Sequence, residues 1–124
     1  MTQAILLFAH GARDPEWAQP FERLRVALLA RTPGAMVELA YLELMQPDLA
    51  AAVDDLASRG ASAVSVVPVF MAQGGHLKRD LPQRIDAVRA RHPGLRISLQ
   101  LAIGEAQTVI EAMAAHIAAH AGSQ

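Results

Sequence analysis

The chain has 124 residues, 52% of them hydrophobic, which suffices for the core of one domain. It contains no cysteine, so disulfides, iron–sulfur clusters and thiolate zinc sites are excluded, and a cytoplasmic protein is expected. The net charge is −1, aromatic residues are few, and no apolar run approaches the roughly 20 residues that span a membrane, so neither a nucleic-acid partner nor a membrane is expected.

Four strands alternate with four helices in the predicted fold. Short apolar runs predict strands at residues 3–9, 35–41, 62–69 and 95–101. Helical periodicity follows each run, at residues 15–31, 47–58, 80–91 and 105–120. This alternation predicts an α/β fold with a single four-stranded parallel sheet in three αβα layers, of the flavodoxin-like kind, as one domain over residues 1–124.

Particular residues mark the ends and the buried faces of these helices. Gly60 is placed to cap the end of the second helix, and Asp80 to cap the start of the third, with Pro82 in its first turn. His116 and His120 share a face of the last helix without a carboxylate nearby, so we expect both to be solvated. The same helix carries an apolar stripe that we expect to be buried, namely Val109, Ile110, Met113 and Ile117.

Two histidines follow predicted strands at one edge of the sheet. His10 and Gly11 come directly after the first strand, and Gly74, Gly75 and His76 follow the third. The carboxyl ends of parallel strands form the crevice in which ligands bind, and imidazoles there can bind a metal ion or take up protons. The glycines permit tight turns, a positive φ or a close approach of the backbone to a ligand. Each histidine taken alone has an ordinary alternative, a hydrogen-bonded or incidental loop residue.

Glu43 follows the second strand and therefore lies at the same edge. A carboxylate there can orient an imidazole, accept protons or join a metal site, whereas the alternative is a capping or surface residue. Positive charge beside these residues favours an anionic ligand, and its candidate carriers are Arg13, Lys78, Arg79 and Arg84.

Two other functions are disfavoured. Histidine phosphatases place Arg before a His-Gly pair, but Ala9 precedes His10 here. Neither the G-x-G-x-x-G nor the Walker pattern surrounds Gly74 and Gly75, so a nucleotide site is not supported.

Three segments together resemble the class II tetrapyrrole chelatases, in particular the branch of sirohydrochlorin cobaltochelatases and ferrochelatases. They are LFAHGARD at residues 7–14, AYLELMQPDL at residues 40–49 and VPVFMAQGGHLKRDLP at residues 67–82. The resemblance covers essentially the whole chain, and the order of the three motifs on an α/β pattern makes it specific. Ala12 departs from it, because many members have Ser there, and the chain lacks a histidine-rich metal-storage segment.

The resemblance implies ATP-independent insertion of a divalent metal ion into sirohydrochlorin, with Co²⁺ as the expected metal and Ni²⁺ or Fe²⁺ as alternatives. His10 and His76 match the histidines that bind the metal and take up pyrrole protons, and Glu43 matches the acidic residue of the active site. Gly74 and Gly75, together with the four basic residues named above, are expected to contact the substrate.

No cofactor beyond the substrate metal is implied. Longer members of the family contain two such domains, so a chain of this length implies a homodimer. The rival interpretation is a dimeric module that binds a metal or a tetrapyrrole without turnover, because it would share every feature of this sequence.

Overall fold

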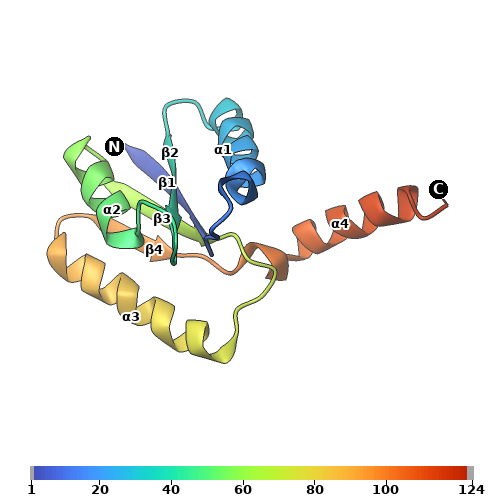
Figure 1. Cartoon of the computed structure of the whole chain (residues 1–124). Helices are drawn as coiled ribbons and strands as arrows, with labels where there is room; N and C mark the ends of the chain where they lie inside the picture. The colour runs from blue at the N-terminus through green and yellow to red at the C-terminus, as the bar shows by residue number, and fades with distance from the viewer. Residues whose placement is uncertain (1, 123–124) are drawn as a thin grey trace.

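The computed structural model describes residues 2–122 and contains a four-stranded sheet (Figure 1). Its strands are parallel and lie in the order β2-β1-β3-β4, which confirms the predicted fold class. The strands are β1 (Gln3–Ala9), β2 (Met36–Tyr41), β3 (Ala63–Pro68) and β4 (Arg96–Leu99). The helices are η1 (Pro15–Ala18), α1 (Gln19–Arg31), α2 (Leu49–Ser58), α3 (Gly75–Arg91), η2 (Ile103–Glu105) and α4 (Gln107–Ala119).

Helices cover the two faces of the sheet unequally. Successive side chains of β1 point to opposite faces, so Leu6 and Phe8 enter one core while Leu7 and Ala9 enter the other. Side chains of α2 and α3 complete the first core. α1 lies on the other face, where it contacts β2 and β1 (Figure 1). The sheet is thus the middle layer of three. The loops that follow the strands lie at its carboxyl edge.

Individual residues explain where the helices of the first half of the chain begin and end. Gly60 has a φ of 94° directly after α2, as the predicted cap requires. The expected helix at 15–31 is divided into η1 and α1. Asp14 caps η1 by accepting a hydrogen bond from the Glu16 amide (3.0 Å), and Pro20 stands at the start of α1, where a residue without an amide hydrogen is tolerated.

α3 begins at Gly75 and not near residue 80, which corrects the predicted start. Gly74 is its N-cap in ordinary extended backbone (φ −71°, ψ 166°), and the Lys78 amide donates to the Gly74 carbonyl (3.0 Å). Asp80 is therefore not the cap; its carboxylate accepts a hydrogen bond from Arg84 one turn later (2.6 Å). Pro82 lies inside the helix and not in its first turn. His76 is consequently a helical residue.

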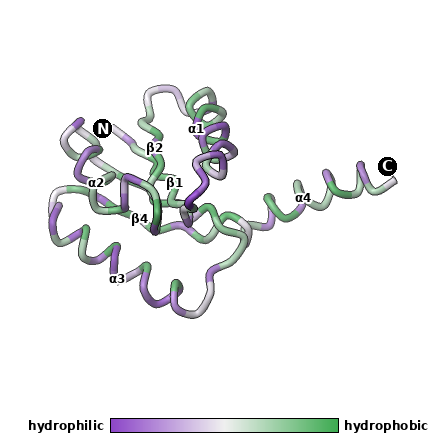
Figure 2. The backbone as a smooth tube through the Cα atoms, in the orientation of Figure 1, coloured by the Kyte–Doolittle hydropathy of each residue, from purple (hydrophilic) through white to green (hydrophobic). Residues whose placement is uncertain are grey.

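α4 projects away from the sheet and packs against neither face (Figures 1 and 2). None of its residues is buried, and Ile110 and Ile117 are 40% and 67% exposed. The predicted burial of Val109, Ile110, Met113 and Ile117 is therefore wrong, although His116 and His120 are exposed as expected. No helix among residues 2–122 combines the length and the apolarity needed to cross a bilayer.

Candidate active site

An open depression of about 800 Å³ lies at the carboxyl edge of the sheet, beside the point where the strand order reverses between β1 and β3. Its walls are His10, Leu42, Glu43, Phe70, Ala72, Gly74, His76, Leu77, Asp80 and Arg84. A smaller hollow of about 330 Å³, lined by residues of α1, β2 and α2, contains none of the predicted site residues. The structure thus places His10, Glu43 and His76, which come from three separate segments, on one surface.

His10 and Glu43 form a hydrogen-bonded pair in this depression. His10 Nε2 lies 3.1 Å from Glu43 Oε1, and 55% of each side chain is exposed. Backbone bonds hold the two residues together, because the Leu42 amide donates to the Ala9 carbonyl and the Glu43 amide to the His10 carbonyl. The ring of Phe70 stands edge-on to that of His10, with 6.3 Å between the ring centroids.

The contact with Glu43 selects one tautomer of a neutral His10. An ionised carboxylate accepts hydrogen bonds and cannot donate them, so Nε2 carries the hydrogen of this contact. The free lone pair of the ring then lies on Nδ1, which makes no hydrogen bond within the described part of the chain. Nδ1 is therefore the atom that can bind a metal ion or accept a proton, and Glu43 is placed to stabilise the positive charge that results.

Gly11 allows the His10 and Glu43 segments to approach this closely. Its φ is 97°, and a Cβ atom at this position would lie 1.9 Å from the Glu43 carbonyl oxygen. We expected the glycine to permit a tight turn or a close approach to a ligand. The backbone that approaches it in this chain is that of Glu43.

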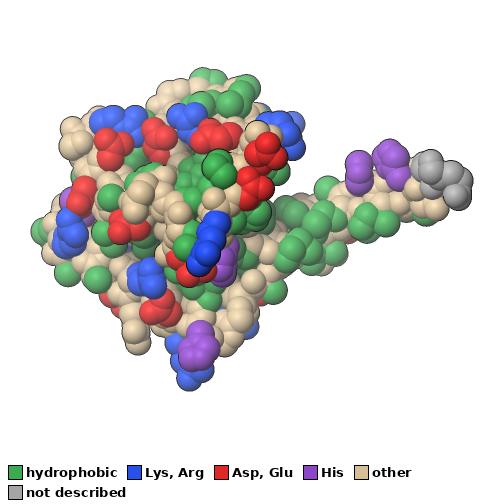
Figure 3. Space-filling model, in the orientation of Figure 1, with side chains coloured by type: hydrophobic (Ala, Val, Ile, Leu, Met, Phe, Trp, Pro, Cys, Tyr) green, Lys and Arg blue, Asp and Glu red, His purple; other side chains and the backbone are tan. Residues whose placement is uncertain are grey.

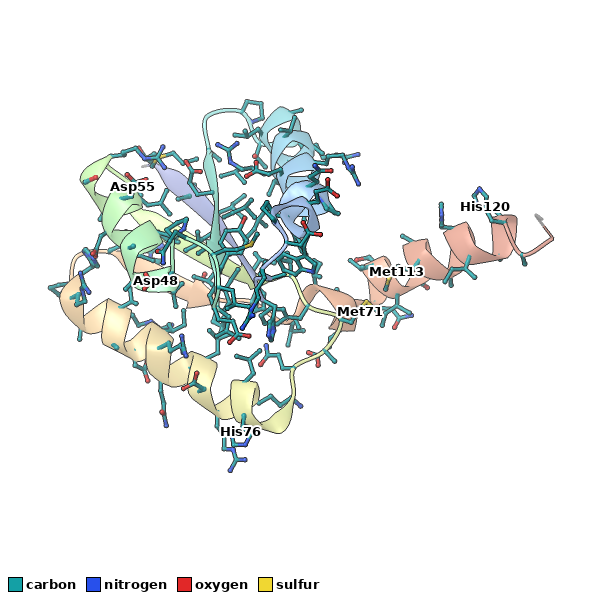
Figure 4. All side chains as sticks on the ribbon, in the orientation of Figure 1. Asp48, Asp55, Met71, His76, Met113 and His120 are labelled. Atoms are coloured by element: carbon teal, nitrogen blue, oxygen red, sulfur yellow. The ribbon has the colours of Figure 1, made fainter. Side chains whose placement is uncertain are left out.

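His76 lies on the first turn of α3, across the depression from the strand ends (Figure 4). Its side chain is exposed. Within residues 2–122, no three His, Asp or Glu side chains are grouped closely enough to hold a metal ion together. His10 and His76 thus line the same depression from different walls.

The predicted substrate-binding residues are distributed unequally around the depression. Gly74 and Arg84 line it, but the Arg84 guanidinium is paired with Asp80. The side chains of Lys78 and Arg79 are exposed at the start of α3, outside the lining residues. Also outside the lining are Gly75, the first residue of α3, and Arg13, which is exposed in the loop after β1. Arg13, Lys78 and Arg79 thus form no ion pair within residues 2–122 and lie outside the lining of the depression.

Five residues that line the depression are not among the site residues predicted from the sequence, namely Leu42, Phe70, Ala72, Leu77 and Asp80. Phe70 could have been found, because it follows β3 at the same edge at which His10 follows β1. Asp80 gives a misleading signal, because an acidic residue two positions before Pro82 is also typical of a helix N-cap.

Comparison with known proteins identifies the family to which this chain belongs. The family model for CbiX matches residues 4–120. The sirohydrochlorin cobaltochelatase of Sulfurisphaera tokodaii is 32% identical over 107 residues, which make up 86% of this chain and 84% of that protein. The sirohydrochlorin ferrochelatase of Bacillus subtilis is 31% identical over 113 residues, 91% of this chain but 43% of that protein. The chain thus spans less than half the length of the Bacillus relative.

Solved structures agree with the sequence matches. The CbiX protein from Marinobacter aquaeolei superposes with a TM-score of 0.85 at 31% identity, covering 98% of this chain and 99% of that one. The sirohydrochlorin chelatase SirB from Bacillus subtilis, in complex with cobalt, superposes with a TM-score of 0.80 at 28% identity, covering 96% of this chain and 51% of that one. Because the family model extends over nearly the whole sequence and the fold agrees, the chain belongs to the CbiX family, and the predicted resemblance to the sirohydrochlorin chelatases is confirmed.

Proposed function

We propose that this protein is a chelatase that inserts a divalent metal ion into sirohydrochlorin without ATP. The observation that supports the proposal is that His10, Glu43 and His76 all line one open depression at the carboxyl edge of the sheet, with His10 and Glu43 hydrogen-bonded to each other. The names of two curated relatives, a sirohydrochlorin cobaltochelatase and a sirohydrochlorin ferrochelatase, support this choice of substrate.

Metal insertion exchanges two pyrrole N–H protons of the tetrapyrrole for one metal ion, so the site must deliver a metal and accept two protons. Imidazole can do both near neutral pH. In the proposed mechanism, His10 acts through Nδ1, and the Glu43 carboxylate stabilises the imidazolium after proton uptake. His76 supplies the second imidazole from the opposite wall.

The proposal assigns the exposed basic residues to substrate binding. Sirohydrochlorin carries carboxylate side chains around a planar ring, and an open depression admits such a ring without enclosing it. The exposed side chains of Arg13, Lys78 and Arg79 can form charge-assisted hydrogen bonds with those carboxylates. Gly74 and Gly75 present backbone without side chains next to His76, so the ring can approach that segment closely.

Two alanine variants test the roles of the histidines. His10→Ala and His76→Ala should each lower the rate of Co²⁺ insertion by about 100-fold or more, because each removes a metal ligand and a proton acceptor. Anaerobic absorption spectroscopy of sirohydrochlorin follows the reaction, and circular dichroism checks the fold. His120→Ala changes an exposed histidine of α4 and serves as the control. Wild-type rates in either test variant would contradict the two-histidine mechanism.

Co²⁺ is the metal that we propose, with Fe²⁺ and Ni²⁺ as alternatives. Imidazole and carboxylate ligands accept all three ions, so the residues alone do not choose among them. The support for cobalt is the cobaltochelatase of Sulfurisphaera tokodaii, of which the match covers 84%. A competition assay with equal concentrations of the three ions should give cobalt sirohydrochlorin as the main product; a main product with iron or nickel would contradict the assignment.

The proposal includes a homodimer, because the match to the Bacillus ferrochelatase covers only 43% of that protein and a second copy would supply another half. The rival function, a dimeric carrier of metal or tetrapyrrole, predicts binding without turnover. Product formed in large excess over protein would support the chelatase. Product that stops at one equivalent per site would favour the carrier.

A further inference from the structure

Asp80 is an acidic residue in a depression that is proposed to receive an anionic substrate, so its presence there needs a physical reason. Apart from the two histidines, the ionisable side chains that line the depression are those of Glu43, Asp80 and Arg84. Glu43 is engaged by its hydrogen bond with His10, whereas Asp80 pairs with Arg84. Acting alone, the negative charge of Asp80 would repel the carboxylates of the substrate.

The contact between Asp80 and Arg84 uses only one edge of the guanidinium. Arg84 Nε donates a hydrogen bond to Asp80 Oδ2 (2.6 Å) across one turn of α3. The terminal nitrogens Nη1 and Nη2 form no hydrogen bond within residues 2–122. Two parallel N–H groups of a guanidinium can bind one carboxylate, and the Nη1–Nη2 edge keeps this capacity while Nε is engaged. Arg84 can therefore bind a second carboxylate without releasing Asp80.

Arg84 borders two hollows, and its contact with Asp80 decides which of them the guanidinium serves. Besides the depression, Arg84 lines a smaller hollow of about 210 Å³ between α2 and α3, which also contains Asp48. Asp80 lines only the depression. A guanidinium on a flexible stem could turn toward either carboxylate, so the hydrogen bond from Nε to Asp80 holds it on the side of the depression.

This anchoring distinguishes Arg84 from the other basic residues that are expected to contact the substrate. Arg84 alone among the lining residues carries a guanidinium or ammonium group, whereas Arg13, Lys78 and Arg79 lie outside the lining. On the face that Figure 3 shows, acidic and basic side chains lie close together over the body of the domain, so that face offers no broad field of one sign to direct an anionic ring. A guanidinium that is already held also loses less side-chain freedom when a ligand binds.

We infer that Arg84 binds one carboxylate of the tetrapyrrole inside the depression, and that Asp80 is the positioning residue that presents the Nη1–Nη2 edge to it. The inference rests on the proposed function and deepens it by naming the pair that orients the substrate. His76, Asp80 and Arg84 follow one another at intervals of four residues, so they form one row along α3.

The length of this row suits a tetrapyrrole. Along the helix axis, a rise of about 12 Å separates His76 from Arg84. The metal ion enters the centre of the ring, whereas the carboxylates lie at its periphery. One row of α3 can therefore serve both parts of the substrate, and the contact at Arg84 fixes how the ring is turned in its own plane.

Titration of metal-free sirohydrochlorin, followed by the absorption of the tetrapyrrole, tests the inference without turnover. Arg84→Lys keeps the charge but loses the paired N–H groups. It should raise the Kd about 10-fold, the lower end of the range for a charge-assisted contact, because the side chain is 46% exposed. Asp80→Asn should raise the Kd about 3–10-fold, because Arg84 is then no longer held. The direction is decisive, since losing a negative charge beside an anionic ligand would by itself tighten binding.

Three further variants separate positioning from the mere loss of a charge. Asp80→Glu keeps a carboxylate that can accept from Nε, so its Kd should lie closer to that of the wild type than the Kd of Asp80→Asn does. Adding Asp80→Asn to Arg84→Gln should weaken binding no further, because the residue through which Asp80 acts is already absent. Asp86→Asn, an exposed residue of α3 outside the lining, is the matched control and should bind like the wild type. Circular dichroism checks the fold of each variant.

Unchanged or tighter binding in Asp80→Asn would overturn the inference, and so would unchanged binding in Arg84→Lys. In the insertion assay, Asp80→Asn should raise the KM for sirohydrochlorin and leave the kcat and the KM for Co²⁺ unchanged. A lower kcat or a higher KM for Co²⁺ would instead assign Asp80 to the metal or to the chemistry. Because the titration needs neither metal nor turnover, a wild type that binds sirohydrochlorin without excess product would contradict the proposed function and leave the inference standing.

Discussion

Gly11 decides the geometry around His10 although it contributes no functional group. Its left-handed backbone turns the chain immediately after His10, and the absence of a side chain lets the Glu43 carbonyl lie against it. The hydrogen bond between His10 and Glu43 depends on this approach, because the two residues are brought together by the backbone and only then by their side chains.

Gly11→Ala should destabilise the protein by about 3 kcal/mol or more, because a left-handed non-glycine residue and a backbone collision are combined at one position. Gly34→Ala is the matched control. Gly34 also has a positive φ (85°), but a Cβ there meets no atom within 4 Å, so only the backbone cost of about 1–2 kcal/mol is expected. Urea unfolding measures both, and equal losses in the two variants would contradict the proposed collision.

Glu43→Gln removes the negative charge of this side chain and keeps its shape. The amide oxygen can still accept the hydrogen bond from His10 Nε2, but the negative charge that would stabilise an imidazolium is lost. The insertion rate should fall by about 10–100-fold, the usual cost of removing a partner that orients a ligand. Glu16→Gln, an exposed residue of η1, controls for the loss of one carboxylate. An unchanged rate in Glu43→Gln would remove Glu43 from the mechanism.

At the scale of helices and strands, the pattern of apolar residues predicts the strands of the sheet but does not predict where α3 begins. β1 begins and ends at the predicted residues, because a run with polar residues at both ends has few alternatives as a buried strand. The start of α3 was hidden by competing signals. Asp80 and Pro82 fit a helix start, whereas Gly74 and Gly75 fit a loop, yet the backbone of Gly74 is extended and caps the helix. The location of His76 on a helix therefore required the structure.

The carboxylate of Asp54 links α2 to the end of α3, and its titration makes the stability of this contact depend on pH. Asp54 on α2 is hydrogen-bonded to His92 Nε2 (2.7 Å) and paired with Arg91 at the end of α3. The hydrogen bond from His92, with the charge of Arg91, lowers the pKa of Asp54 below its ordinary value. The ionised form is therefore preferred in the folded state, and its stabilisation is present above the ordinary pKa of aspartate, about 3.9, and is lost as the pH falls through the lowered value.

Asp54→Asn should therefore lower the melting temperature at pH 7, and the difference from wild type should shrink as the pH falls below about 4, where aspartate in the unfolded chain becomes protonated. Asp86→Asn removes an ion pair with Arg89 within α3 alone and controls for the loss of a surface charge. Thermal unfolding monitored by circular dichroism at several pH values provides the measurement. A difference that stays constant from pH 7 to pH 3 would contradict the linkage.

At the scale of the whole molecule, the sequence predicts that α4 exists but not the direction in which it projects from the sheet. The apolar stripe of Val109, Ile110, Met113 and Ile117 predicts a buried face, yet none of these side chains is buried within residues 2–122. Periodicity identifies the apolar face of a helix and not the direction in which the helix runs. The direction of α4 is set by the contact of Gly104 with Phe70 and Met71, which brings together positions more than 30 residues apart without any local signature.

Ile117→Asp should convert the proposed homodimer to a monomer if α4 contributes to its interface, because it introduces a charge into the apolar groove of about 430 Å³ that Thr108, Val109, Ala112, Met113, His116 and Ile117 line along α4. The mass from light scattering at micromolar concentration should fall from about twice 13.3 kDa to about 13.3 kDa. His120→Asp places the same charge just beyond α4 and outside the groove, so it should remain dimeric. If α4 holds the dimer together, the melting temperature of the wild type should also rise with protein concentration, whereas that of Ile117→Asp should not. A dimer of undiminished affinity in Ile117→Asp would show that another surface joins the two copies.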